Sequence, residues 1–255
     1  MDLLEALKNA LPTPVRRRLS AWRRDLPRKM LVLDRVTNFS VLRRTQPYRR
    51  DFGVHRGQCI DRYYIEAFLL ANRNDIRGKV LEVQSSIYTR YYGRSNVSHC
   101  DVIDIDENNA ARTVTADLNQ CEGVPDNAYD CVVLPQTLML IYDFEAVIRS
   151  LHRVLKPGGI LLATFPGIAQ LCPPEMLGAG TEYWRFTRFS AAKAFAKYFQ
   201  SENTQVAAHG NVLTAVAFLH GLVVEELTKA ELDYHDPDYE VTITVRARKA
   251  PQDMA

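Results

Sequence analysis

The chain has 255 residues, 47% of them hydrophobic, and a formal net charge of +2. This length suits one sizeable α/β domain with an extension, and two fully independent domains would be cramped. No run of about 18 apolar residues occurs, so no membrane-spanning helix is expected. The N-terminus also lacks the apolar stretch of a secretory signal.

The five cysteines are scattered along the chain and form no C-x-x-C pair. Such spacing argues against both a disulfide framework and a structural zinc site. We therefore expect reduced thiols in a cytoplasmic protein, and no metal site.

The beginning of the chain is basic. Residues 1–50 hold 13 Lys or Arg against 4 Asp or Glu, and leucines recur at helical spacing on either side of Pro12 and Pro14. We predict a basic helical extension over residues 1–59 that wraps a domain formed by residues 60–255. Peripheral contact of the extension with an anionic membrane surface is an alternative role. Nucleic-acid binding is not expected, because no aromatic platform accompanies the arginines.

The first elements of the domain follow from apolar spacing. A helix is predicted from Asp61 to Leu70, with its apolar side chains on one side. Short segments with apolar residues lie at Lys79–Val83, near residues 101–106, at residues 114–118 and at Tyr129–Leu134.

The clearest secondary-structure signal lies further along the chain, at residues 151–165. A helix with Leu151, Val154 and Leu155 on one face stops at Pro157, because proline lacks a helical N–H and the glycines after it permit positive φ. The apolar run Ile160–Phe165 that follows suits a parallel strand buried on both faces.

The C-terminal part adds three elements. A helix is predicted over Ser190–Phe199 with Thr187 or Ser190 as its N-cap. An Ala- and Val-rich helix is predicted over residues 211–227, and the alternating run Tyr239–Ala247 predicts a half-buried strand.

The order of these segments, with the R-V-L-K-P-G-G element at Arg153–Gly159, resembles the class I S-adenosylmethionine-dependent methyltransferases. The resemblance implies that Lys79–Val83, residues 114–118 and Tyr129–Leu134 are the first, third and fourth strands of the sheet, with the second near residues 101–106. The resemblance implies a doubly wound α/β fold with a seven-stranded Rossmann-like sheet, mostly parallel, whose last strand runs antiparallel at the edge. It also implies S-adenosylmethionine as cofactor, bound at the carboxyl edge of the sheet.

The same resemblance assigns roles to acidic residues at strand ends. Glu82 pairs with the ammonium of the cofactor's methionine, and a carboxylate ending the second strand accepts the ribose hydroxyls. Family spacing favours Asp101 for the ribose, whereas the apolar run beside it favours Asp104 or Asp106. Asp117 accepts from the adenine amino group.

Further cofactor contacts are implied by position. The backbone N–H of Leu118 reaches the adenine ring, and Gln136 follows the fourth strand where relatives contact the methionine. Tyr63 or Tyr64, on the helix before the first strand, is expected to cover the methionine end, with core packing as the alternative.

The loop after the first strand departs from the family pattern. Relatives usually read E/D-x-G-x-G-x-G, whereas this chain reads Glu82-Val-Gln-Ser-Ser-Ile-Tyr88, with no glycine until Gly93. Ser85 is small enough to allow close backbone approach to the cofactor. Gln84 and Tyr88 carry Cβ atoms where positive φ is expected.

The segment Tyr183-Trp184-Arg185-Phe186-Thr187 resembles a string found in methyltransferases encoded among glycan-building enzymes. Aromatic faces stack on sugar rings, and arginine binds acidic sugars or a nucleotide diphosphate. We therefore expect O-methylation of a saccharide or glycan precursor. The alternative role of Trp184 and Phe186 is to anchor a loop to the sheet.

No motif identifies the base that an alcohol acceptor needs. Candidates are His209, His220, Asp143 and Glu182, and no pattern predicts an oligomeric state. Two alternatives to a methyltransferase remain. The first is a binding or assembly partner that has the methyltransferase fold without turnover, which the missing glycines indicate. The second is another Rossmann-like enzyme with a nucleotide cofactor.

Overall fold

The computed structural model describes residues 43–173 and 181–251. The basic segment 1–42 lies outside this range, so the predicted extension stays a prediction. The compact unit that contains the sheet begins at Pro47. Residues 48–52 lie against α8 (Val212–Leu219), where the Tyr48 N–H donates to the His220 carbonyl and Phe52 packs on Phe218. In the described ranges we find no helix long and apolar enough to cross a membrane.

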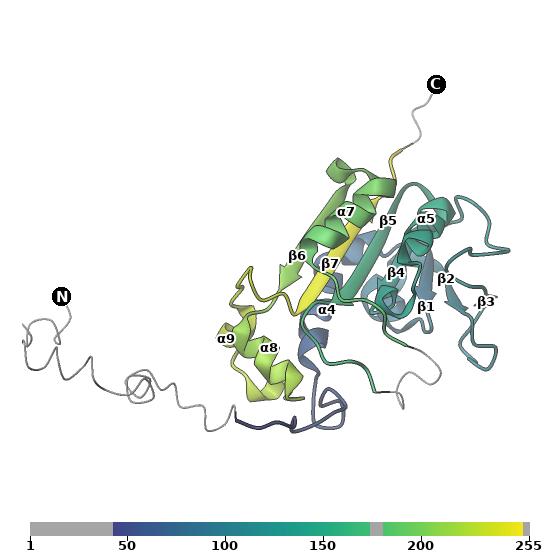
Figure 1. The fold of residues 1–255 in the computed structure, drawn as a ribbon. Helices are drawn as coiled ribbons and strands as arrows, with labels where there is room; N and C mark the ends of the chain where they lie inside the picture. The colour runs from purple at the N-terminus through teal and green to yellow at the C-terminus, as the bar shows by residue number, and fades with distance from the viewer. Residues whose placement is uncertain (1–42, 174–180, 252–255) are drawn as a thin grey trace, which may run out of the picture. The chain divides into compact units, whose positions relative to one another are not determined.

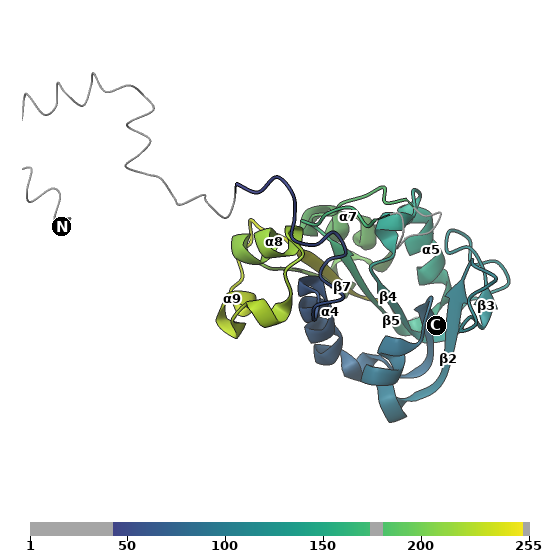
Figure 2. The same ribbon diagram turned by 90° about the horizontal axis from the view of Figure 1, so that it is seen from below.

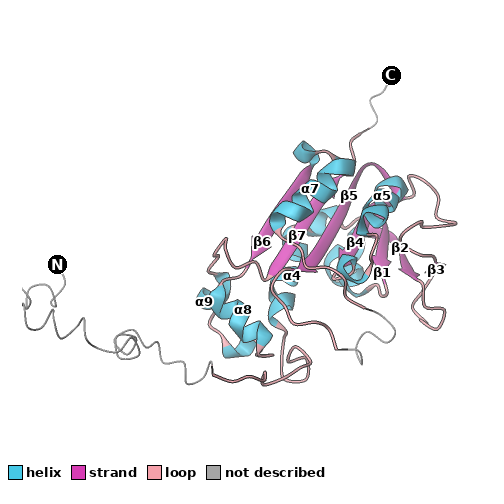
Figure 3. Cartoon of the chain, viewed as in Figure 1, coloured by secondary structure: helices cyan, strands magenta, loops and turns pink. Residues whose placement is uncertain are grey.

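A seven-stranded sheet of order β3-β2-β1-β4-β5-β7-β6 forms the centre of this unit (Figures 1 and 3). β1 to β5 run parallel, and β7 runs antiparallel between β5 and β6. The strands are β1 (Gly78–Val83), β2 (Val97–Asp104), β3 (Val114–Thr115), β4 (Tyr129–Pro135), β5 (Leu155–Pro166), β6 (Thr204–His209) and β7 (Thr242–Arg248). The predicted doubly wound α/β sheet is confirmed. Its strand order reverses between β1 and β4, the switch point where ligands bind in folds of this kind.

Helices cover both faces of the sheet (Figures 1 and 2). α5 (Phe144–Val154) and α7 (Arg188–Phe199) pack on one face, and α4 (Ile60–Ala71) packs on the other. Beside α4 lie α8 and the short α9 (Lys229–Asp233). The Thr187 hydroxyl caps α7 in a capping box with Ser190, as the sequence predicts.

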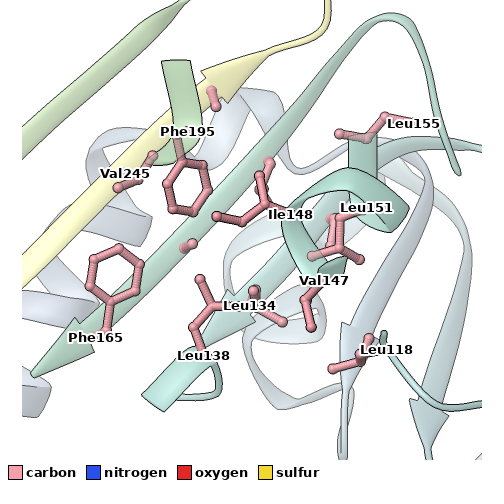
Figure 4. Close-up of a cluster of buried hydrophobic side chains, with 14 of the residues drawn as sticks. Leu118, Leu134, Leu138, Val147, Ile148, Leu151, Leu155, Phe165, Phe195 and Val245 are labelled. Atoms are coloured by element: carbon pink, nitrogen blue, oxygen red, sulfur yellow. The ribbon is translucent and has the colours of Figure 1, made fainter. Parts of the chain in front are cut away.

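The larger core cluster lies between the sheet and the pair α5 and α7 (Figure 4). Leu134 and Phe165 project from β4 and β5 onto Ile148 and Leu151 of α5 and Phe195 of α7, and all five are buried. Each such side chain contributes about 1.5 to 3 kcal/mol on leaving water. This core holds β4, whose carboxyl end forms part of the site, against its neighbour β5.

Three sequence predictions need correction. β7 was expected at the edge, but β6 occupies the edge, because its short run of alternately exposed residues pairs with β7 and gave no strong strand signal. The helix predicted over 211–227 ends at Leu219, since Gly221 adopts φ +68° against the Arg49 backbone. The helix predicted through Leu155 ends at Val154.

Candidate functional site

The loop after β1 is held by Glu82. This side chain is 1% exposed, and its two carboxylate oxygens accept from the backbone N–H groups of Tyr88 at 3.0 Å and Thr89 at 2.7 Å. Both N–H groups lie in the first turn of a short helix, where no carbonyl of the same helix can accept from them. Burial raises the pKa of Glu82, and the hydrogen bonds from Thr89 and Tyr88 offset part of that rise. Glu82 therefore faces the loop backbone, and its expected contact with an ammonium stays a prediction.

Two glutamines adopt left-handed backbone conformations beside the switch point. Gln84, after β1, has φ 63°, and Gln136, after β4, has φ 46°. Their N–H groups donate to Ile103 and Thr164 on the neighbouring strands. For a non-glycine residue this conformation costs on the order of 1 kcal/mol, and such strain gathers at functional sites. The turn after β1 thus forms without the glycines that the resemblance implied. Ser85 follows this turn, and its N–H donates to the Val83 carbonyl.

Asp104 ends β2 and lies at the same edge. Its Oδ1 accepts from the Asp106 N–H at 3.0 Å, and its Oδ2 accepts from the Asn109 amide at 2.6 Å. The Asn109 amide also donates to the Gln84 carbonyl at 2.7 Å, which ties the loops after β1 and β2 together. Sequence reasoning missed Asn109, because nothing local indicates that its side chain crosses to another loop.

Asp101 lies inside the sheet. It pairs with Leu81 of β1, and its carboxylate contacts Lys79, His99, Thr113 and Tyr129 at 2.9 to 3.1 Å. Burial raises its pKa, but these hydrogen bonds outweigh burial and lower the pKa of Asp101 to about 2. The structure therefore brings Asp104, and not Asp101, to the carboxyl edge.

We expect Asp101→Asn to lower the free energy of unfolding by about 2 kcal/mol, the scale of hydrogen bonds to a buried charge. Because the folded pKa lies below the ordinary value, this contribution is complete above about pH 4 and is lost as pH falls toward 2. Urea denaturation of both proteins between pH 2.5 and 7 measures the difference. A difference that does not shrink with falling pH would contradict the assignment.

Asp117 and Leu118 follow β3. The Asp117 carboxylate is exposed, and its Oδ1 accepts from the N–H and the amide of Asn119, both at 2.9 Å. Among the described residues its Oδ2 accepts no hydrogen bond. Leu118 is buried in the larger core cluster and anchors this turn. Asp117 is thus presented to solvent with one free oxygen.

Tyr63 lies on the α9 side of α4, where its hydroxyl donates to Asp233 at 2.6 Å. This hydrogen bond raises the pKa of Tyr63. The neighbouring Arg62 contacts the loop after β1 instead, and donates to the Tyr88 hydroxyl at 2.7 Å. Tyr63 thus contacts α9, whereas Arg62, which the sequence did not single out, contacts the loop after β1; the expected role of Tyr63 at the cofactor stays a prediction.

The candidate bases have structural partners. Asp143 caps α5, and Glu182 pairs with Arg185 at 2.8 Å. His209 stacks on Tyr64, and burial lowers its pKa. The His220 ring packs against Tyr48, with ring centroids 5.6 Å apart, and its Nδ1 is buried without a hydrogen bond among the described residues. These contacts do not identify any of the four residues as the base. Within residues 43–173 and 181–251, no cluster of metal-ligating residues occurs.

Part of the chain that contains this edge of the sheet is similar to a known protein family. Residues 82–163, about a third of the chain, match the family described as methyltransferase domain. This match covers less than half of the chain; together with the seven-stranded sheet above it supports a methyltransferase domain with S-adenosylmethionine as its cofactor.

Individual relatives are distant. A 38-residue stretch is 50% identical to the ubiquinone/menaquinone biosynthesis C-methyltransferase UbiE of Enterobacter sp. (strain 638), but it covers 15% of each chain. An S-adenosylmethionine-dependent methyltransferase from Mesorhizobium loti is 14% identical over 74% of this chain and 98% of its own, with a TM-score of 0.49. The 1,6-didemethyltoxoflavin-N1-methyltransferase of Burkholderia thailandensis, solved with S-adenosylhomocysteine, is 14% identical over 77% and 81%, with a TM-score of 0.48.

The residues at the edge fit the cofactor's donors. A ribose hydroxyl is a donor like the Asn109 amide, so on binding it would replace that amide on Asp104 Oδ2. Asp117 Oδ2 is free among the described residues to accept from the exocyclic amine of the adenine. The Gln136 side chain makes no hydrogen bond in the described part of the chain. Asp104 and Asp117 would thus hold the nucleoside, and the contact of Gln136 with the methionine stays a prediction.

Proposed function

We propose that the protein methylates an oxygen of a saccharide or glycan precursor. The observation that carries this proposal is an exposed aromatic surface formed by Tyr142, Tyr183 and Trp184. Tyr142 and Tyr183 are 70% and 51% exposed, and their ring centroids lie 5.5 Å apart. The Trp184 ring lies 5.7 Å from Tyr142. Exposed aromatic faces of this kind stack on sugar rings.

The aromatic surface is tied to the end of β4. The N–H of Tyr183 donates to the Met139 carbonyl at 2.8 Å, and Met139 lies in the helical turn Leu138–Leu140 just after that strand. The Trp184 indole donates to the Tyr142 carbonyl at 3.0 Å. Since Gln136 precedes the same turn, a sugar on this surface would lie beside the cofactor's edge of the sheet.

The other members of the string have internal roles. Phe186 is buried against Phe144 and Phe165, which fits the loop-anchoring alternative for this residue. Arg185 donates to Glu182 and to the Gln170 carbonyl, both at 2.8 Å. Its guanidinium is engaged within the fold, so the surface favours a neutral sugar over an acidic one.

The cofactor, when bound, supplies an electrophilic methyl group. The residues of this chain then have to align the acceptor oxygen with that group and exclude water. The exposed tyrosines position the sugar ring, and the turn after β4 sets its distance from the nucleoside.

A second function is favoured by one contact. Asn109 spans Asp104 and Gln84 across the ribose position, and the loop has no glycine. This arrangement fits a methyltransferase-fold binding or assembly partner that does not turn over.

The test is transfer of a labelled methyl group from S-adenosylmethionine to a panel of neutral and acidic saccharides. We expect Tyr142→Ala and Tyr183→Ala each to raise the acceptor KM about tenfold, the scale of one aromatic contact. Tyr142→Phe keeps the aromatic face and is the matched control. Their affinity for S-adenosylhomocysteine should not change. If this ligand binds but no saccharide is methylated, the non-catalytic function is favoured.

A further inference from the structure

Two short segments meet at the amino edge of the sheet, opposite the candidate site. The turn Arg73–Asp75 precedes β1, and the helix Thr89–Gly93 with the turn Arg94–Asn96 precedes β2. Because β1 and β2 run parallel, their amino ends share this edge. The segments are in contact, since a Cβ atom added to Gly93 would lie 2.8 Å from the Ile76 Cγ2.

Four arginines on these segments face solvent. The buried side chains of Ile76 and Tyr92 pack in one core cluster and hold both segments against the sheet. Their exposed neighbours include Arg73, Arg77, Arg90 and Arg94. None of these four guanidinium groups pairs with a carboxylate in the part of the chain that the structure describes. Asp75, the acidic residue beside them, accepts instead from Arg246 at 2.8 and 3.1 Å.

Two large apolar side chains are exposed among the arginines. Tyr91 is 65% exposed, and Leu70, near the end of α4, is 51% exposed. The Tyr91 ring lies edge-on to Tyr92 at 5.0 Å, and the Arg94 Nε donates to the Tyr91 carbonyl at 3.2 Å, so both contacts hold this residue in place. We call the four arginines with Tyr91 and Leu70 the basic surface. Cations without counter-charges around exposed apolar side chains are typical of an interaction site.

We propose that the basic surface binds the anionic headgroups of a phospholipid bilayer. The arginines meet headgroup phosphates in charge-assisted hydrogen bonds, and Tyr91 and Leu70 enter the boundary between the headgroups and the acyl chains. A single-stranded nucleic acid fits less well, because one exposed ring gives no platform for successive bases and Leu70 has no face to stack on. Docking through the amino edge leaves the carboxyl edge open for cofactor and acceptor.

Co-sedimentation of the full chain with vesicles tests the proposal. We expect binding to vesicles of phosphatidylcholine and phosphatidylglycerol in equal parts, with affinity that falls as salt rises, and little binding to phosphatidylcholine alone. The double variant Arg90→Gln/Arg94→Gln should lower the partition coefficient about 30-fold, since each arginine near an anionic surface contributes about fivefold. Arg149→Gln/Lys193→Gln is the matched control, because it removes the same charge from exposed positions on α5 and α7, over the opposite face of the sheet.

The apolar contribution has its own test. Tyr91→Ser should lower the partition coefficient about tenfold, on the scale of one aromatic side chain leaving water, and this loss should persist in high salt. Tyr91→Phe keeps the ring and should retain the binding. Unchanged midpoints of thermal unfolding show that the variants fold.

Hydrogen exchange on the wild-type chain needs no variant, and vesicles should slow exchange at residues 89–96. Full vesicle binding by Arg90→Gln/Arg94→Gln would overturn the proposal and assign the binding to another part of the chain, such as the basic segment 1–42. An equal loss in the control pair would overturn it too, because general charge would then explain the binding. Wild-type chain that binds a single-stranded oligonucleotide but no vesicles would assign the basic surface to nucleic acid instead.

Discussion

Glu82→Ala is expected to lower the free energy of unfolding by about 3 kcal/mol. The substitution leaves the N–H groups of Tyr88 and Thr89 buried without an acceptor, and each such group costs about 1 to 3 kcal/mol. Because these bonds hold the loop after β1, S-adenosylhomocysteine binding should weaken as well. Urea denaturation and calorimetry on the same preparations measure both effects.

The pH dependence of Glu82→Gln gives the control. Glutamine keeps one acceptor oxygen, so its loss of stability should be smaller than that of alanine. The folded pKa of Glu82 is raised, so wild-type stability falls as pH rises from about 4.5 through that pKa. The gap between wild type and Glu82→Gln should therefore narrow as pH rises through this window. A gap that widens would refute the buried environment we assign to this carboxylate.

Asp104→Ala is expected to weaken S-adenosylhomocysteine binding about 100-fold, because one carboxylate receives both ribose hydroxyls and each charged hydrogen bond contributes about 1.5 to 3 kcal/mol. Asp106→Ala removes a neighbouring exposed carboxylate and is the control, with little change expected.

Two nucleosides, one with and one without the ribose hydroxyls, test whether Asp104 acts through the ribose. The loss in Asp104→Ala should appear with adenosine and disappear with 2′,3′-dideoxyadenosine, which lacks the hydroxyls. A similar loss with both nucleosides would show that Asp104 acts through the loop it shares with Asn109, and not through the ribose.

Local patterns predicted much of the fold. β1, β4 and β5 contain apolar runs at residues 80–81, 131–134 and 160–163, and the Thr187 cap lies next to the helix it starts. β6 escaped prediction because an exposed edge strand of six residues has little apolar signal, and its identity depends on pairing with β7, far along the chain.

The site was less predictable for a related reason. Whether Asp101 or Asp104 reaches the edge depends on the register between β1 and β2, which no local pattern encodes. The bridge from Asn109 to two loops is likewise set by tertiary structure.

The most direct test of the account is a crystal structure of the full chain with S-adenosylhomocysteine. We predict the ligand across the carboxyl ends of β1 and β4, with both ribose hydroxyls on Asp104 and the adenine amine on Asp117. A ligand bound elsewhere, or crystals grown at saturating ligand with Asn109 still bridging Asp104 and Gln84 over an empty edge, would contradict it.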